Sequence, residues 1–165
     1  MADAAPDLAA LQSLNASAYH WYADPVQVRA DDLLVRSHAG ESLCRAADAL
    51  ARLETEARHA MPAPSRAHPF PTADAARPLQ RLRQLHDRIK SLETRLRGGG
   101  SLPDKDFSTS HGVSQSLREK LVACDAVLIA AAEAVAAADP DALETALAEL
   151  GNAIENRAAT IRMRL

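Results

Sequence analysis

The 165-residue chain has the length of one ordinary domain, a formal net charge of −3 and a hydrophobic content of 47%, with only 3% aromatic residues. This balance excludes a polybasic nucleic-acid binder and an acidic disordered chain, and no apolar run is long enough to predict a membrane-spanning helix. Because Ala and Leu supply most of the apolar side chains, the composition favours an all-α fold.

Residues 6–38 are predicted to form an N-terminal helical segment. A short helix is expected from about residue 6 to residue 22, because Leu8, Leu11 and Leu14 recur at helical spacing. Asp24 followed by a proline marks the start of the next helix. The glycine in His38-Ala39-Gly40 predicts a kink or break, since glycine is unfavourable inside a helix. The segment is expected to pack beside the main helices or to cover one end.

Three of the five aromatic residues lie between residues 19 and 22. The spacing predicts that Tyr22 faces inward and that Tyr19 lies next to the apolar stripe, so the cluster would anchor the corner before Asp24, whereas Trp21 points elsewhere. The alternative interpretation is a patch for a partner, with Trp21 as its anchor. His20 between them leaves a third possibility, a ligand site formed by Tyr19, His20 and Tyr22 together with His86.

Four longer helices follow from apolar residues spaced three and four apart. They are predicted at residues 41–61, 74–97, 113–138 and 140–165. Their similar lengths predict an antiparallel four-helix bundle within a single helical domain, residues 1–165. A proline-rich connector precedes residue 74, and Asp139 is predicted to cap the last helix.

Arg81, Arg88 and Arg95 recur every seven residues along the second of these helices. Residues 77–97 carry a net charge of +5, so the rest of the chain sums to −8. One interpretation is that these arginines pair with acids on adjacent helices. The other is a docking face for an acidic protein partner. Nucleic acid is not favoured, because no recognition motif accompanies the arginines.

Metal and catalytic motifs are not evident. None of the six histidines has the helical spacing of a metal-binding pair, so neither a metal nor another cofactor is predicted. Cys44 and Cys124 are expected to be reduced thiols on apolar helix faces. The hydroxyl groups and the histidine of residues 108–111 are explained as helix capping more readily than as a nucleophile, so enzymatic activity is left open without support.

The favoured hypothesis is a cytoplasmic, non-catalytic interaction protein of the adaptor, chaperone or assembly-factor kind, able to self-associate. Its start, with two aspartates and no basic residue, does not resemble a secretory signal. Partner binding is assigned to Trp21, Arg81, Arg88 and Arg95, and glutamates at the three arginines are expected to abolish it. The alternative is a ligand- or cofactor-binding bundle that uses the histidine and tyrosine cluster.

Overall fold

The computed structural model describes residues 8–14, 19–63, 66, 70–98 and 113–162. These residues form a short 3₁₀ helix, η1 (Leu8–Ser13), and four α-helices: α1 (Val28–His59), α2 (Ala73–Gly98), α3 (Gln115–Ala137) and α4 (Leu143–Arg162). The described part contains no strand. The prediction of an all-helical protein with four long helices is confirmed.

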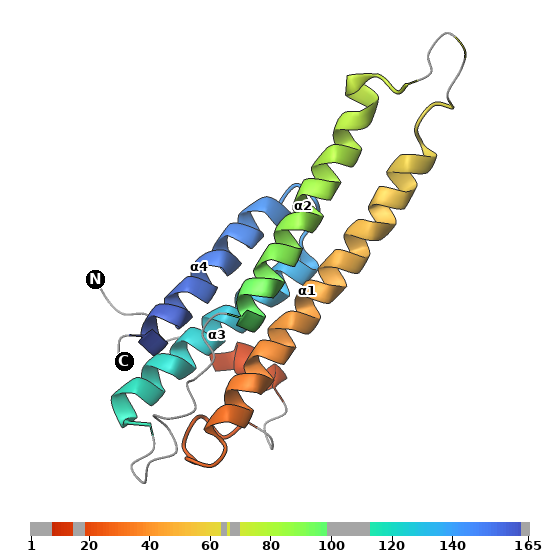
Figure 1. The fold of residues 1–165 in the computed structure, drawn as a ribbon. Helices are drawn as coiled ribbons and strands as arrows, with labels where there is room; N and C mark the ends of the chain where they lie inside the picture. Colours follow the sequence, from red (N-terminus) through yellow and green to blue (C-terminus); the bar gives the residue numbers. More distant parts are fainter. Residues whose placement is uncertain (1–7, 15–18, 64–65, 67–69, 99–112, 163–165) are drawn as a thin grey trace.

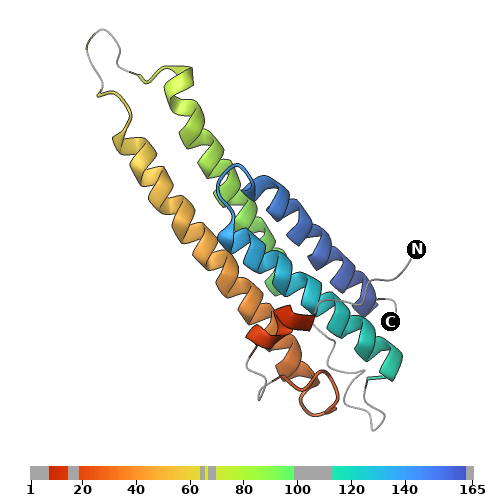
Figure 2. The ribbon, with the colours of Figure 1, turned by 180° about the vertical axis from the view of Figure 1, so that it is seen from behind.

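The four helices lie side by side, and η1 packs against α3 (Figures 1 and 2). Neighbouring helices contact one another in the cyclic order α1, α2, α4, α3, so α1 and α4 occupy opposite corners. Leucine, isoleucine, valine and alanine at three- and four-residue spacing fill the centre. The most completely buried aliphatic residues include Val35, Leu43, Ile89, Leu121, Leu128, Ile129, Leu147 and Leu150.

The first long helix differs from its predicted bounds. The α1 helix runs without a break from Val28 to His59, so residues 28–38 belong to this helix and not to a separate N-terminal segment. The sequence predicted a kink or break at Gly40, and the helix is not broken there. Ala39 and Leu43 on either side of Gly40 are fully buried, which indicates that packing outweighs the poor helix propensity of one glycine.

The residues before α1 also depart from the expected helix. Among the described residues before α1, 8–13 are the helical ones, and Trp21 and Tyr22 adopt left-handed backbone angles, with φ of 57° and 55°. Asp24 Oδ1 accepts from the backbone N–H of Val26 at 2.9 Å, so Asp24 closes a turn before α1 instead of capping the helix directly. The spacing of apolar residues could not predict this turn, because side-chain hydrogen-bond acceptors stabilise it.

The turn between α3 and α4 follows the predicted capping. Asp139 Oδ1 accepts from the backbone N–H groups of Asp141 and Ala142 at 3.0 and 2.9 Å. The carbonyl of Asp139 then accepts from Leu143 N–H at the start of α4. Because α1 and α2 continue past this turn, their ends project beyond α3 and α4 (Figure 1). None of the described helices is long and apolar enough to cross a lipid bilayer.

Candidate functional site

A buried polar cluster lies at the end of the molecule where α1 begins. Arg157 of α4 donates from Nε to Asp125 Oδ1 of α3 at 2.7 Å and from Nη2 to Asp32 Oδ1 of α1 at 2.6 Å. All three side chains are almost inaccessible to solvent. One guanidinium therefore joins three helices.

Both tyrosines of the chain complete this cluster. Tyr22 Oη donates to Asp125 Oδ2 at 2.6 Å and accepts from Arg157 Nη2 at 3.1 Å. Tyr19 Oη donates to the same Asp125 oxygen at 3.0 Å. The two rings meet edge to face with their centroids 5.9 Å apart. Tyr22 is buried, as predicted, and so is Tyr19 beside it; the hydroxyl groups of both are already bonded within the protein.

Asp31 holds the backbone around these tyrosines. Its Oδ1 accepts from His20 N–H at 2.9 Å, and its Oδ2 accepts from Tyr22 N–H at 2.8 Å. Two consecutive left-handed residues other than glycine cost free energy, on the order of 1–2 kcal/mol each. The buried carboxylate stabilises this conformation by bonding to both sides of Trp21. Trp21 itself is more than one-third exposed and contacts Tyr19.

Burial sets the protonation chemistry of the cluster. It raises the pKa of Asp125 above its ordinary value, although Arg157 and the two tyrosine hydroxyls oppose the rise. Burial also raises the pKa of Tyr19 and of Tyr22, and the nearby Asp125 carboxylate adds to the effect. Burial lowers the pKa of Arg157, but Asp125, Tyr22 and Asp32 outweigh it, so the pKa lies well above the ordinary value.

The hydrogen bonds of the cluster are complete. No buried side-chain nitrogen or oxygen in the described residues lacks a partner. Since its donors and acceptors are occupied by one another, this arrangement joins the N-terminal segment to α1, α3 and α4 and offers no free group for a substrate. The role of this cluster is structural.

The periodicity contains a signal for this cluster that the sequence analysis missed. Asp125 lies four residues after Leu121 and three before Leu128, on the buried face of α3. Arg157 lies at equivalent spacing between Ile154 and Ile161 on α4. A charged residue at a core position needs a buried partner of opposite charge, so these two positions predict a pair.

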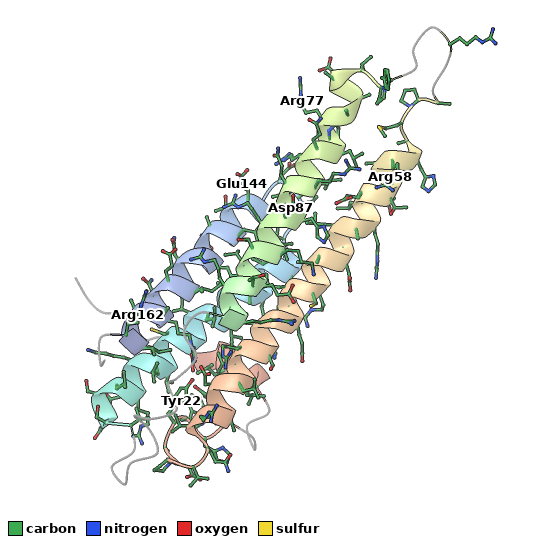
Figure 3. All side chains as sticks on the ribbon, viewed as in Figure 1. Tyr22, Arg58, Arg77, Asp87, Glu144 and Arg162 are labelled. Atoms are coloured by element: carbon green, nitrogen blue, oxygen red, sulfur yellow. The ribbon has the colours of Figure 1, made fainter. Side chains whose placement is uncertain are left out.

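The three periodic arginines of α2 face acids at α4 and the turn before it. Arg81 pairs with Asp141 at 2.8 Å, Arg88 with Glu144 at 3.2 Å and Arg95 with Glu155 at 2.6 Å. Each arginine side chain is about half exposed, and such surface pairs contribute little to stability. Trp21 is near Tyr22, at the opposite end of the molecule from Arg77 and Arg58 (Figure 3).

The structure separates the other predicted site residues. His20 is 3.5 Å from Asp31, whereas His86 is 4.0 Å from Glu54. Asp31 and Glu54 are both in α1 and lie 23 positions apart, which is about 35 Å along a helix. The four residues of the predicted ligand site therefore do not form one pocket.

The two cysteines also face different neighbours. Cys44 is exposed and lies 3.9 Å from Glu93 on α2, so its expected position on an apolar face is wrong. Cys124 is half-buried and lies 3.5 Å from Thr160 on α4. Within the described ranges, no group of three or more histidine, cysteine or acidic residues could hold a metal ion. Residues 108–111 lie outside the described residues.

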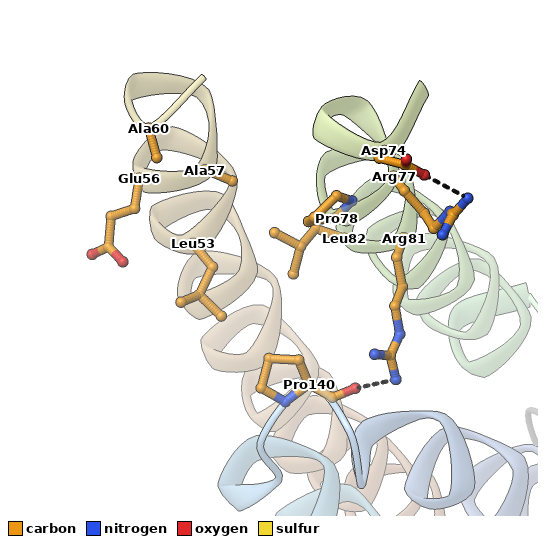
Figure 4. A pocket seen from close by; sticks show the side chains of 10 residues that line it. All are labelled: Leu53, Glu56, Ala57, Ala60, Asp74, Arg77, Pro78, Arg81, Leu82 and Pro140. Atoms are coloured by element: carbon orange, nitrogen blue, oxygen red, sulfur yellow. Dashed lines mark hydrogen bonds and ion pairs between the residues drawn. The ribbon is translucent and has the colours of Figure 1, made fainter. Parts of the chain in front are cut away.

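An open cleft lies between the projecting ends of α1 and α2. Its volume is about 700 Å³, and Pro140 of the turn between α3 and α4 forms its floor. Leu53 and Ala57 of α1 face Pro78 and Leu82 of α2 across the cleft (Figure 4). Charged side chains surround this apolar interior, namely Glu56, Asp74, Arg77 and Arg81.

Arg81 connects this cleft with the row of arginines on α2. Its guanidinium donates to the carbonyl of Pro140 at 3.5 Å (Figure 4). The same guanidinium pairs with Asp141. Arg88 and Arg95 lie further along α2, beside a smaller groove between α2 and α4. The sequence predicted the arginine row but not the cleft, because the cleft depends on how far α1 and α2 project past the α3–α4 turn.

Comparison with known proteins adds no family assignment. No family model matches the chain, and no curated protein and no solved structure matches it either. The structure thus defines an all-helical protein with a closed polar cluster at one end and an open apolar cleft at the other. Those two features are the basis for the functional proposal.

Proposed function

We propose that this protein is a non-catalytic interaction protein that binds a helical segment of another protein in the cleft between the ends of α1 and α2. The observation that carries the proposal is the cleft itself, which combines an apolar interior with a charged rim. A groove of this kind receives the apolar side chains of an amphipathic helix, whose backbone hydrogen bonds are already satisfied. The occupant is a protein segment with apolar residues on one face.

The distribution of charge along this chain indicates which charge the partner segment should carry. Residues 51–83, which include both projecting helix ends, contain six arginines and three acids, a net charge of +3. The whole chain is −3, so the remainder is −6. An acidic segment would be attracted to this end and repelled by the rest of the surface. The partner helix is therefore expected to carry carboxylates beside its apolar face.

The arginine row extends the proposed surface. Arg81 lies on the rim of the cleft, and Arg88 and Arg95 continue from it along α2. Their present pairs with acids are exposed, so a partner carboxylate could replace them at small cost. Trp21 is at the other end of the molecule and would be a separate contact.

The proposal also takes the fold to be an antiparallel four-helix bundle with an additional N-terminal segment. The protein would act in the cytoplasm as an adaptor, chaperone or assembly factor.

The proposal is tested by blocking the cleft. The variant Ala57→Glu introduces a longer, negatively charged side chain into the lining without removing a core residue. Ala51→Glu is the matched control, because Ala51 is an exposed alanine of the same helix and is not part of the lining. Each purified variant is used to capture proteins from a lysate of the source organism, and the captured proteins are quantified by mass spectrometry.

A partner retained by the wild type and by Ala51→Glu, but lost with Ala57→Glu, supports the proposal. Capture that is equal for all three proteins contradicts it. Loss of the same partner in the triple variant Arg81→Gln, Arg88→Gln, Arg95→Gln assigns the arginine row to the surface. If size-exclusion chromatography with light scattering shows that Ala57→Glu instead dissociates a homodimer, the occupant is a second copy of the chain.

A further inference from the structure

A second hollow lies beside α1, near the C-terminal end of α2. Its volume is about 630 Å³, and one face of α1 between Leu33 and Arg45 forms most of the wall, completed by Arg97 of α2. The lining contains three arginines, at positions 36, 45 and 97, and one acid, Glu41, a net charge of +2. Asp32 and Glu93 lie outside the lining and partly offset the charges of Arg36 and Arg97.

The three arginines are held to different degrees. Arg36 donates from Nε and Nη2 to Asp32 Oδ2 at 3.0 and 2.8 Å, and from Nη1 to the carbonyl of Arg97 at 3.3 Å. Arg97 Nη2 donates to Glu93 at 2.6 Å. Arg36 is thus fixed in position, and the charge of the exposed Arg97 is partly neutralised by the half-buried carboxylate of Glu93.

The positive charge of Arg45 is the least neutralised of the three. Its Nη2 donates to the neutral hydroxyl of Ser42 at 2.9 Å, and within the described residues it forms no ion pair. An arginine presents a planar set of N–H donors that matches the oxygens of a phosphate group. Arg45 is therefore the residue in the lining best able to bind an added anion.

We propose that this hollow binds a small organic molecule that carries a phosphate group. The arginines would hold the phosphate, and Leu33, whose side chain is 58% exposed, would contact an apolar part of the molecule. Gly40 leaves open space in the wall, because no atom lies within 4 Å of where its Cβ would be. Glu41 would accept a hydrogen bond from a hydroxyl or amino group of the ligand. The volume is within the range of small-molecule sites, roughly 300–1,000 Å³.

The test is a titration of the full chain with inorganic phosphate and with phenyl phosphate, at constant ionic strength maintained with potassium chloride. Binding is followed by calorimetry and by the Nε–H resonances of ¹⁵N-arginine-labelled protein. The double variant Arg45→Gln, Arg97→Gln removes two cations while leaving Arg36 and its bonds to Asp32 intact. Arg52→Gln is the control, an exposed arginine of α1 outside the lining.

We expect phenyl phosphate to bind more tightly than inorganic phosphate. We also expect the double variant to weaken binding by about tenfold or more, and Arg52→Gln to leave it unchanged. Three results would overturn the proposal: no saturable binding of either probe, equal affinity for the two probes, or an equal loss of affinity in Arg52→Gln. Because the cleft between α1 and α2 has a different lining, failure here would leave the proposed partner binding intact.

Discussion

Arg157 of α4 bonds to Asp32 of α1 at 2.6 Å, although these helices occupy opposite corners of the four-helix arrangement. The long guanidinium side chain spans the centre and also contacts Asp125 on α3. Arg36, one helical turn after Asp32, donates to the other oxygen of that carboxylate. The interior at this end is consequently joined by charge-assisted hydrogen bonds, whereas the middle is joined by aliphatic packing.

Replacing Arg157 with Leu should strongly destabilise the protein. The change leaves Asp125 and Asp32 buried without their shared cation, and breaking a buried ion pair in this way typically costs about 3–5 kcal/mol. The free energy of unfolding is measured by urea titration followed by circular dichroism. Adding Asp125→Asn to Arg157→Leu should recover part of the loss, because the amide is neutral. A loss that matches an exposed substitution such as Arg52→Gln would contradict this role.

Stability should decrease above pH about 10, where tyrosine ionises in the unfolded chain. Burial raises the pKa of Tyr19 and Tyr22, so the folded protein retains both phenolic protons at a pH where the unfolded chain loses them. The contribution is present in full below pH 10 and is lost as the pH rises further. Urea titrations between pH 8 and pH 11, roughly bracketing the ordinary tyrosine pKa, measure this decrease.

The double variant Tyr19→Phe, Tyr22→Phe is the control for this pH dependence. It should be less stable at neutral pH, by about 1 kcal/mol for each hydrogen bond lost to Asp125. Its stability should nevertheless decrease less steeply above pH 10, since the chain contains no other tyrosine. Tyrosinate absorbance that develops at the ordinary pKa in the folded wild type would show that these phenols are not buried.

Asp31→Ala should release the backbone around Trp21. The substitution removes the acceptor of two N–H groups, and an unsatisfied buried donor such as Tyr22 N–H costs about 1–3 kcal/mol. We expect faster amide exchange at residues 20–22 and a shift in the fluorescence of Trp21, the one tryptophan of the chain. Asp24→Ala, which removes one exposed acceptor, should have a smaller effect. Equal effects of the two variants would argue against a special role for Asp31.

Gly40→Ala should stabilise the protein by about 0.5–1 kcal/mol. Gly40 lies inside the continuous helix α1, and an added Cβ would meet no atom within 4 Å. A thermal melt compared with the wild type measures the change. A variant less stable than the wild type would contradict the continuous helix through Gly40.

The sequence was sufficient for the long helices but not for the ends of the first. Leu85, Ile89, Leu92 and Leu96 alternate at three- and four-residue spacing, and all four are buried in α2. Gly40 misled the prediction because local propensity is weak compared with the burial of neighbouring side chains. The helix predicted to run to residue 22 is not found at Trp21 and Tyr22, which adopt left-handed backbone angles. Their conformation depends on Asp31, which no local pattern connects to them.

The sequence by itself determined the all-helical class and the four long helices, because apolar spacing along one chain reports which face of a helix is buried. Only the tertiary structure decided that Arg157 meets Asp125 and Asp32, and that α2 arginines pair with acids at α4 and the turn before it. It also revealed the cleft between α1 and α2. Pairing and concavity depend on the relative lengths and positions of different helices, which periodicity within each helix does not contain.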